Sequence, residues 1–178
     1  MTRSAFTPTL FDKIVSNLEL SGITSEGLEA QSAEFNKRSF RFHSVSDLDR
    51  YTEGAVRTTV MRELAWLLNT VNLESSVDLT AYPEVQTSVL NYGVNDMTGK
   101  SASSRALQVR AARIKQAIET FEPRIDPESL VVENVPIKDR ADVTQFVIRC
   151  DITSAVAAIP LRMVTDIEAD TGDATVRG

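Results

Sequence analysis

The chain has 178 residues, 42% of them hydrophobic, and a formal charge of -6 from 19 basic and 25 acidic residues. This length supports one domain with a real hydrophobic core, but it is short for two full domains. The acidic balance argues against a generally nucleic-acid-binding surface, because phosphate binding needs clustered lysine and arginine. We therefore expect no nucleic acid among its partners.

Histidine and cysteine occur once each, as His43 and Cys150. A single cysteine forms no intramolecular disulfide, and its position in an apolar run is typical of a buried side chain in a reducing compartment. One histidine is too few for a His/Cys zinc cluster and argues against a Ser-His-Asp triad. The start does not resemble a signal peptide, and no stretch has the roughly 18 to 20 apolar residues of a membrane span. We predict a cytoplasmic protein with no direct membrane insertion, no metal and no cofactor.

The first element that we expect is a short helix near the start, because Leu10, Phe11, Ile14, Val15 and Leu18 form one apolar stripe. The segment 21–39 that follows has no sustained period and is typical of a linker. Residues 1–45 are therefore predicted to form an N-terminal helix and linker, followed by a domain at 46–178. An isolated helix of this length is marginally stable in water. Its apolar face, through Phe11, Ile14 and Leu18, either packs on the domain or inserts into a groove on a partner.

A long helix is predicted from about Ser46 to Leu68, where apolar residues recur at helical spacing. Trp66 near its end is more typical of a packed aromatic than of an exposed docking residue. The connection 69–104 loses this periodicity and contains turn signals such as Tyr82-Pro83. A connection this long is either functional or contains short helices. We expect its apolar pair Val89-Leu90 to pin it to the core.

A second long helix is predicted at 104–121, with an apolar stripe formed by Leu107, Ala111, Ile114, Ile118 and Phe121. Four basic residues lie off this stripe, and we call them the basic ridge: Arg105, Arg110, Arg113 and Lys115. On an acidic protein this ridge is either an ordinary solvated face or a docking face.

The last third of the chain is β-rich at 130–132, 144–152 and 161–167, with turn signals between these runs. Side chains along 143–150 alternate so that one face of the strand is more polar than the other, which predicts an antiparallel sheet covered by helices on one face. The predicted fold class is therefore α+β, with helices packed on one face of a small antiparallel sheet and an N-terminal helical extension. The candidate strand 174–176 is short and terminal, so we expect it at an edge open to strand addition.

The most informative stretch is Phe121-Glu122-Pro123-Arg124, which we call the corner, where the second long helix gives way to β-rich sequence. Pro123 has no backbone donor and disfavours the helical conformation at Glu122. The helix should end here and leave two opposite charges on a stiff turn. Such a turn is a buried ion pair, a catalytic carboxylate with its arginine, or a docking point for another protein.

The catalytic alternative for the corner is glycoside hydrolysis, such as peptidoglycan cleavage, by Glu122 paired with Asp126 or Glu128. Arg124 argues against it, because a neighbouring cation favours an ionised carboxylate whereas a general acid must carry a proton. The sequence also has no phosphate-binding glycine loop, metal-ligand spacing or nucleophile elbow. We predict no catalytic residues.

Five motifs occur in a fixed order along the chain: Leu10-Phe11-Asp12-Lys13-Ile14, Leu67-Leu68-Asn69-Thr70, Tyr82-Pro83, Ser88-Val89-Leu90-Asn91-Tyr92-Gly93 and the corner. In this order they resemble the TssE family of type VI secretion baseplate subunits, which is related to the lysozyme-like wedge proteins of contractile phage tails. The resemblance covers roughly residues 8 to 176, and the Glu-Pro-Arg corner is the family's signature.

The resemblance implies a cytoplasmic structural protein on the cytoplasmic side of an inner-membrane-anchored assembly. It would join baseplate wedges made with TssF, TssG and TssK to the first ring of the TssB/TssC sheath, and its role would be assembly, not cleavage. By the same analogy, Glu122, Pro123 and Arg124 would dock on the helical core bundle of the wedge, while a sheet edge would accept sheath strands.

The docking mechanism expected from the sequence has Arg124 donating paired hydrogen bonds to a partner while Pro123 fixes its direction. On this hypothesis Arg124→Ala folds normally but no longer joins the wedge. The alternative is an internal brace between Glu122 and Arg124, in which case the substitution unfolds the protein.

Overall fold

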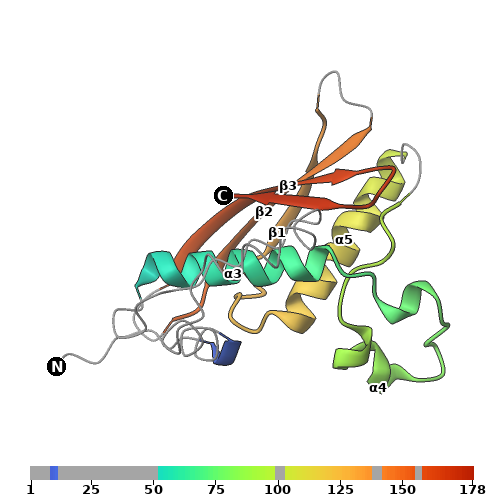
Figure 1. Ribbon diagram of the computed structural model, residues 1–178, viewed down its shortest axis with the longest axis horizontal. Coiled ribbons are helices and arrows are strands. Elements are labelled where there is room, and N and C mark those ends of the chain that lie inside the picture. The colour runs from blue at the N-terminus through green and yellow to red at the C-terminus, as the bar shows by residue number, and fades with distance from the viewer. Residues whose placement is uncertain (1–8, 12–51, 99–102, 138–141, 155–157) are drawn as a thin grey trace, which may run out of the picture.

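The computed structural model describes residues 9–11, 52–98, 103–137, 142–154 and 158–178. Two long helices, α3 (Glu53–Leu68) and α5 (Ser104–Phe121), lie against a four-stranded sheet (Figure 1). The predicted α+β class is confirmed. None of the described helices is both long enough and apolar enough to cross a membrane. Ile14, Leu18, His43, Ser46 and the predicted boundary at residue 45 lie outside the described residues.

Helix α3 is shorter than predicted because it begins at Glu53, not near Ser46. Thr52 has an extended backbone, which prevents α3 from continuing towards Ser46, and its side chain accepts a hydrogen bond from the Ala55 N–H at 3.3 Å. Helix α5 has the predicted bounds, and the Ser103 side chain caps it in the same way. Both helices bury an apolar stripe that contributes to the core.

The sheet is an antiparallel meander in the order β1 (Val131–Val135), β2 (Val143–Ile152), β3 (Ile159–Glu168) and β4 (Ala174–Arg177). Helix α5 packs on β1, and α3 packs on β3 and β4. Ile148 pairs with Met163 on the face that these helices cover, and both side chains are fully buried. Strands β1 and β4 are the two edges, as predicted for the last strand. Cys150 is buried in the core, also as predicted.

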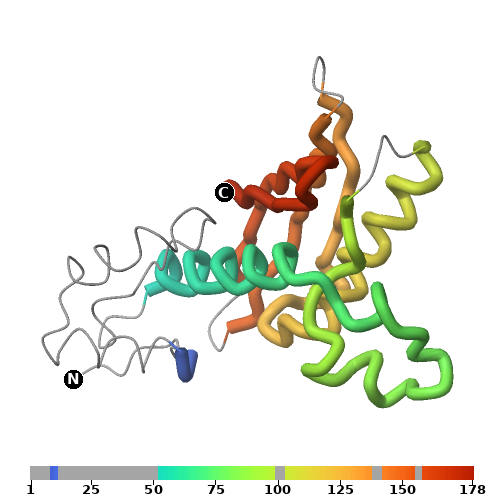
Figure 2. Tube along the Cα trace, turned by 45° about the vertical axis from the view of Figure 1, so that its right-hand side comes forward, coloured from blue at the N-terminus to red at the C-terminus, as the bar shows by residue number. Residues whose placement is uncertain are grey.

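Over its described residues 69–98, the connection between α3 and α5 contains three short helices, η3 (Leu73–Ser75), α4 (Pro83–Gln86) and η4 (Val89–Asn91). Figures 1 and 2 show this part of the chain projecting away from the sheet. The predicted role of Val89-Leu90 is wrong, because the two residues are 83% and 70% exposed. Leu79 and Val94, each 3% exposed, are buried in this connection instead.

The Leu67–Thr70 motif and the Ser88–Gly93 motif meet where this connection crosses the end of α3. Val71 forms a parallel bridge with Val94, and the Val94 N–H donates to the Thr70 carbonyl at 2.8 Å. Gly93, which precedes Val94, has a φ of 125°, and a Cβ at this position would lie 2.3 Å from the Thr70 carbonyl oxygen. Only glycine fits here, because both the backbone conformation and the contact exclude a side chain.

Candidate docking site at the Glu-Pro-Arg corner

The corner is a turn that backbone hydrogen bonds fix against the end of β2. Helix α5 ends at Phe121, as predicted, and the Glu122 N–H donates to the Ile118 carbonyl at 2.9 Å. Buried Ile125 then bridges to Ile152, and the Thr153 N–H donates to the Arg124 carbonyl at 2.7 Å. These contacts set the direction in which the side chains of the corner point.

Arg124 is held by two carboxylates of its own chain. Its Nε donates to Glu122 Oε1 at 2.7 Å, and its Nη2 donates to Glu122 Oε2 at 2.6 Å, which makes a bidentate pair. Nη2 also lies 2.5 Å from Oε2 of Glu63 on α3. Nη1 lies 3.5 Å from Oγ1 of Thr59, one turn earlier in the same helix. The arginine therefore joins the end of α5 to α3.

The charged cluster continues along α3 to the N-terminal residues. Arg62 Nη2 donates to Glu63 Oε1 at 2.9 Å. The Arg62 guanidinium lies 4.7 Å from the ring centre of Phe11 and 5.0 Å from that of Trp66, while the two rings meet edge to face. In space, the contacts run from Glu122 to Arg124, then to Glu63 and then to Arg62. The charge alternates in sign along this row, so each charged side chain has an opposite neighbour.

Burial makes Glu122 and Arg124 an internal brace. The Glu122 side chain is 5% exposed and that of Arg124 is 26% exposed. Both carboxylate oxygens of Glu122 already accept from Arg124, so the paired hydrogen bonds expected for a partner are made within this chain. Docking of the corner on a partner stays a prediction. In this chain the bidentate pair of Arg124 and Glu122 shapes the corner, and Pro123 is exposed on its surface.

Three titrating groups near the corner are shifted by their surroundings. Burial raises the pKa of Glu63, with a further contribution from Glu122, although Arg124 acts in the opposite direction. Burial, helped by the charges of Glu63 and Glu122, raises the pKa of Tyr92 to about 12. Burial also raises the pKa of Cys150 to about 11, so this thiol is a poor nucleophile at neutral pH.

A hollow of about 250 Å³ lies beside the brace and brings the sequence motifs together. It is lined by Phe11, Glu63, Leu64, Trp66, Leu67, Tyr92, Phe121 and Glu122. Tyr92 contacts Phe121 edge to face at 5.4 Å, which connects the Asn-Tyr-Gly motif to the corner. Residues from four separate motifs thus surround one small, mostly apolar space that is large enough for a side chain of another protein.

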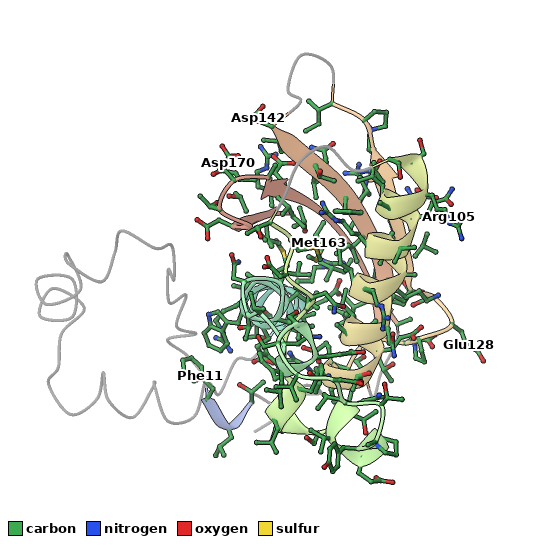
Figure 3. All side chains as sticks on the ribbon, turned by 90° about the vertical axis from the view of Figure 1, so that its right-hand side faces the viewer. Phe11, Arg105, Glu128, Asp142, Met163 and Asp170 are labelled. Carbon is green, nitrogen blue, oxygen red and sulfur yellow. The ribbon has the colours of Figure 1, made fainter. Side chains whose placement is uncertain are left out.

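The catalytic alternative finds little support in this geometry. Glu122 is buried and both its oxygens are occupied, whereas a general acid must reach the glycosidic oxygen of its substrate. Asp126 accepts from the Glu128 N–H at 3.0 Å, and Glu128 points away from the molecule (Figure 3). The carboxylate that the fold places near Glu122 is that of Glu63, and the Arg124 guanidinium lies between the two. Among the described residues, no group of three or more His, Cys, Asp or Glu residues is arranged to hold a metal ion.

The other predicted contact residues lie in two places. Phe11 packs on Trp66 and Arg62 of this chain, which favours intramolecular packing for that residue, while Ile14 and Leu18 lie outside the described residues. Trp66 is half-buried in this contact, as expected for a packed aromatic. In the basic ridge, Lys115 pairs with Glu119 at 3.7 Å and Arg113 with Glu74 at 4.0 Å, whereas exposed Arg105 extends outward (Figure 3).

Sequence reasoning missed Glu63, Arg62 and Thr59 as parts of the brace. A weak signal was present, because Arg62 and Glu63 lie between Met61 and Leu64 of the apolar stripe of α3, and Glu63 is one turn from Leu67. Charged residues at such positions are normally buried only when paired. The identity of the partner had no local signal, since Glu63 and Arg124 are 61 positions apart.

The comparison with known families agrees with this arrangement. A sequence model described as Baseplate wedge protein gp25 matches residues 55–156, from α3 to just beyond β2. The match includes the corner and covers more than half of the 178 residues. The chain belongs to this family, whose members are structural parts of the baseplates of contractile tails. No curated protein matches the chain.

Proposed function

We propose that this chain is the TssE-type baseplate subunit of a type VI secretion machine. It joins wedges built from TssF, TssG and TssK to the first ring of the TssB/TssC sheath. It does so on the cytoplasmic side of an inner-membrane-anchored assembly. The observation that carries the proposal is the family match together with the meeting of the TssE-like motifs around one braced corner.

The geometry supports a role in rigid attachment. A buried, bidentate ion pair fixes the direction of Pro123, so little order is lost when a partner binds there. The sheet has two edges, β1 and β4, where a strand of another subunit can add by backbone hydrogen bonds. Wedge attachment at the corner and sheath attachment at an edge would use separate surfaces.

The experiment is a pull-down of the full chain with co-expressed TssF and TssG, at low salt so that charge contacts persist. Pro123→Ala is the informative variant, because Pro123 is exposed and its side chain makes no part of the brace. Pro127→Ala, at an exposed proline four residues later, is the matched control.

We expect the wild type and Pro127→Ala to bind TssF/TssG, and Pro123→Ala to bind at least several-fold more weakly with an unchanged melting temperature. Failure of the folded wild type to bind would contradict the proposed function. Equal binding by all three proteins would keep the function but move the contact away from the corner.

A further inference from the structure

The connection between α3 and α5 exposes large apolar side chains that the fold does not use. Val89 and Leu90 are adjacent on η4 and are 83% and 70% exposed, and Tyr82 at the start of α4 is 61% exposed. We call these three residues the loop surface. Neighbouring apolar side chains held in solvent are typical of a binding site, because they gain nothing from the fold that carries them.

Buried amide groups hold this surface rigidly. The Asn91 side chain, in a residue only 5% exposed, donates to the Gln86 carbonyl at 3.0 Å and accepts from the Glu74 N–H at 2.9 Å. The Ser88 hydroxyl oxygen accepts from the Leu90 N–H at 3.3 Å. The backbone below Val89 and Leu90 is thereby tied to both α4 and η3. A surface ordered in advance loses little conformational entropy on binding.

The connection that carries the loop surface is itself acidic, although Arg113 of α5 pairs with Glu74 at 4.0 Å. Residues 69–98 contain Glu74, Asp78, Glu84 and Asp96 but no lysine, arginine or histidine. Hydrogen bonds from Thr80 and Thr98 lower the pKa of Asp78 and Asp96, so both carboxylates stay ionised at neutral pH. Glu84 is exposed on α4, beside Tyr82. Because Glu74 has Arg113 as a neighbour, Asp78 and Glu84 are the acidic residues that favour a partner with basic residues.

We propose that the loop surface binds an amphipathic segment of a wedge protein, which places an apolar side chain on Val89 and Leu90 and lysine or arginine beside the acidic residues. The choice of a TssF or TssG segment rests on the proposed function. The contact is separate from the corner and gives the wedge a second point of attachment on the same subunit.

The first experiment measures binding of the full chain to purified TssF/TssG at several salt concentrations. Val89→Ser/Leu90→Ser should bind about tenfold more weakly or worse, with an unchanged melting temperature. Glu84→Lys should bind a few-fold more weakly, and its affinity should depend less on salt. Val109→Ser, at a 54% exposed valine on α5, is the matched control and should bind like the wild type.

The second experiment identifies the bound segment by placing the photo-reactive residue p-benzoylphenylalanine at position 90 and sequencing the cross-linked peptides. We expect a TssF or TssG peptide with lysine or arginine within one helical turn of the cross-linked residue. Wild-type binding that the double variant leaves intact overturns this inference alone, whereas loss of binding by the wild type overturns the proposed function with it. Cross-links only to a second copy of this chain would show a self-association surface and also overturn it.

Discussion

The corner buries a charged side chain and the loop surface exposes apolar ones, which is the opposite of what is usual in a folded protein. At the corner, Glu122 is 4% exposed and its charge is neutralised by Arg124. On η4, Val89 and Leu90 stand in solvent on a backbone secured by a buried asparagine. The charged residue Glu122 is thus buried where Arg124 of the same chain supplies the opposite charge, and the apolar residues Val89 and Leu90 are exposed where none of the described side chains covers them. Local polarity predicts neither position without knowledge of the partners.

The largest expected effect comes from breaking the brace with Arg124→Ala. This change leaves Glu122 buried without its partner, so we expect the free energy of unfolding to fall by about 3 kcal/mol or more. Arg149→Ala is the matched control, since Arg149 pairs with Glu133 on the exposed face of the sheet and its removal should cost at most about 1 kcal/mol. Urea denaturation measures both, and equal losses would show that the corner pair is no more internal than the surface pair.

A second test compares two leucines of the same connection. Leu79→Ala removes a side chain that is 3% exposed and should cost about 2 to 4 kcal/mol. Leu90→Ala changes a side chain that is 70% exposed and should alter the free energy of unfolding by less than about 0.5 kcal/mol. Thermal melting and urea titration of the pair measure the difference. A large loss for Leu90→Ala would mean that η4 packs on the domain.

The rigidity of the connection is tested at Gly93. Gly93→Ala combines a positive φ with a close approach to the Thr70 carbonyl and should destabilise the protein by about 2 kcal/mol. Gly54→Ala in the first turn of α3 is the control, because the nearest heavy atom to a Cβ there is 3.7 Å away. That change should raise stability by about 0.5 to 1 kcal/mol. If both variants melt like the wild type, the crossing at Gly93 is not held as tightly as the contact implies.

The smallest expected effect concerns pH and Glu63. Because the folded state raises the pKa of Glu63 above 4.5, the native protein binds more protons at this residue than the unfolded chain does. Its contribution to stability is therefore largest below pH 4.5 and declines as the pH rises through the folded pKa. The Glu63→Gln variant lacks this titrating group, so its free energy of unfolding should not show this decline with pH. Measured in urea titrations, the free energy of unfolding of the variant minus that of the wild type should therefore increase from pH 4 to pH 7. An opposite slope would show that Arg124 and Arg62 outweigh the burial of Glu63.

The sequence predicted the elements more reliably than their tertiary contacts. The bounds of α5 were predictable because an apolar stripe of spacing three and four runs between a serine cap and a proline. The strands were predictable from β-branched runs and turn residues. The start of α3 was not, because Thr52 and Ser46 are both acceptable caps and the extended conformation of Thr52 decides between them.

The candidate site was predictable only in part. Pro123 defines the corner locally, so its position and stiffness follow from the sequence. The role of Arg124 depends on Glu63, which reaches it from another helix. Likewise, the buried Asn91 fixes the orientation of η4, whereas hydrophobicity alone places Val89 and Leu90 in the core. In both places a long-range polar contact decides the outcome, and such contacts leave no periodic pattern in the chain.

Asn69, at the end of α3, connects this early helix to the last strand of the sheet. Its side chain donates to the Ala174 carbonyl and accepts from the Ala174 N–H, each at 2.9 Å, so it pairs with β4 as a neighbouring strand would. The two residues are 105 positions apart, which a ribosome takes about 5 to 20 s to translate. For most of that interval, until residues 159–168 have been made, the apolar stripe of α3 lacks both β3 and β4, the strands on which it packs. The end of α3 therefore gains its hydrogen bonds to β4 only after β1, β2 and β3 have been synthesised.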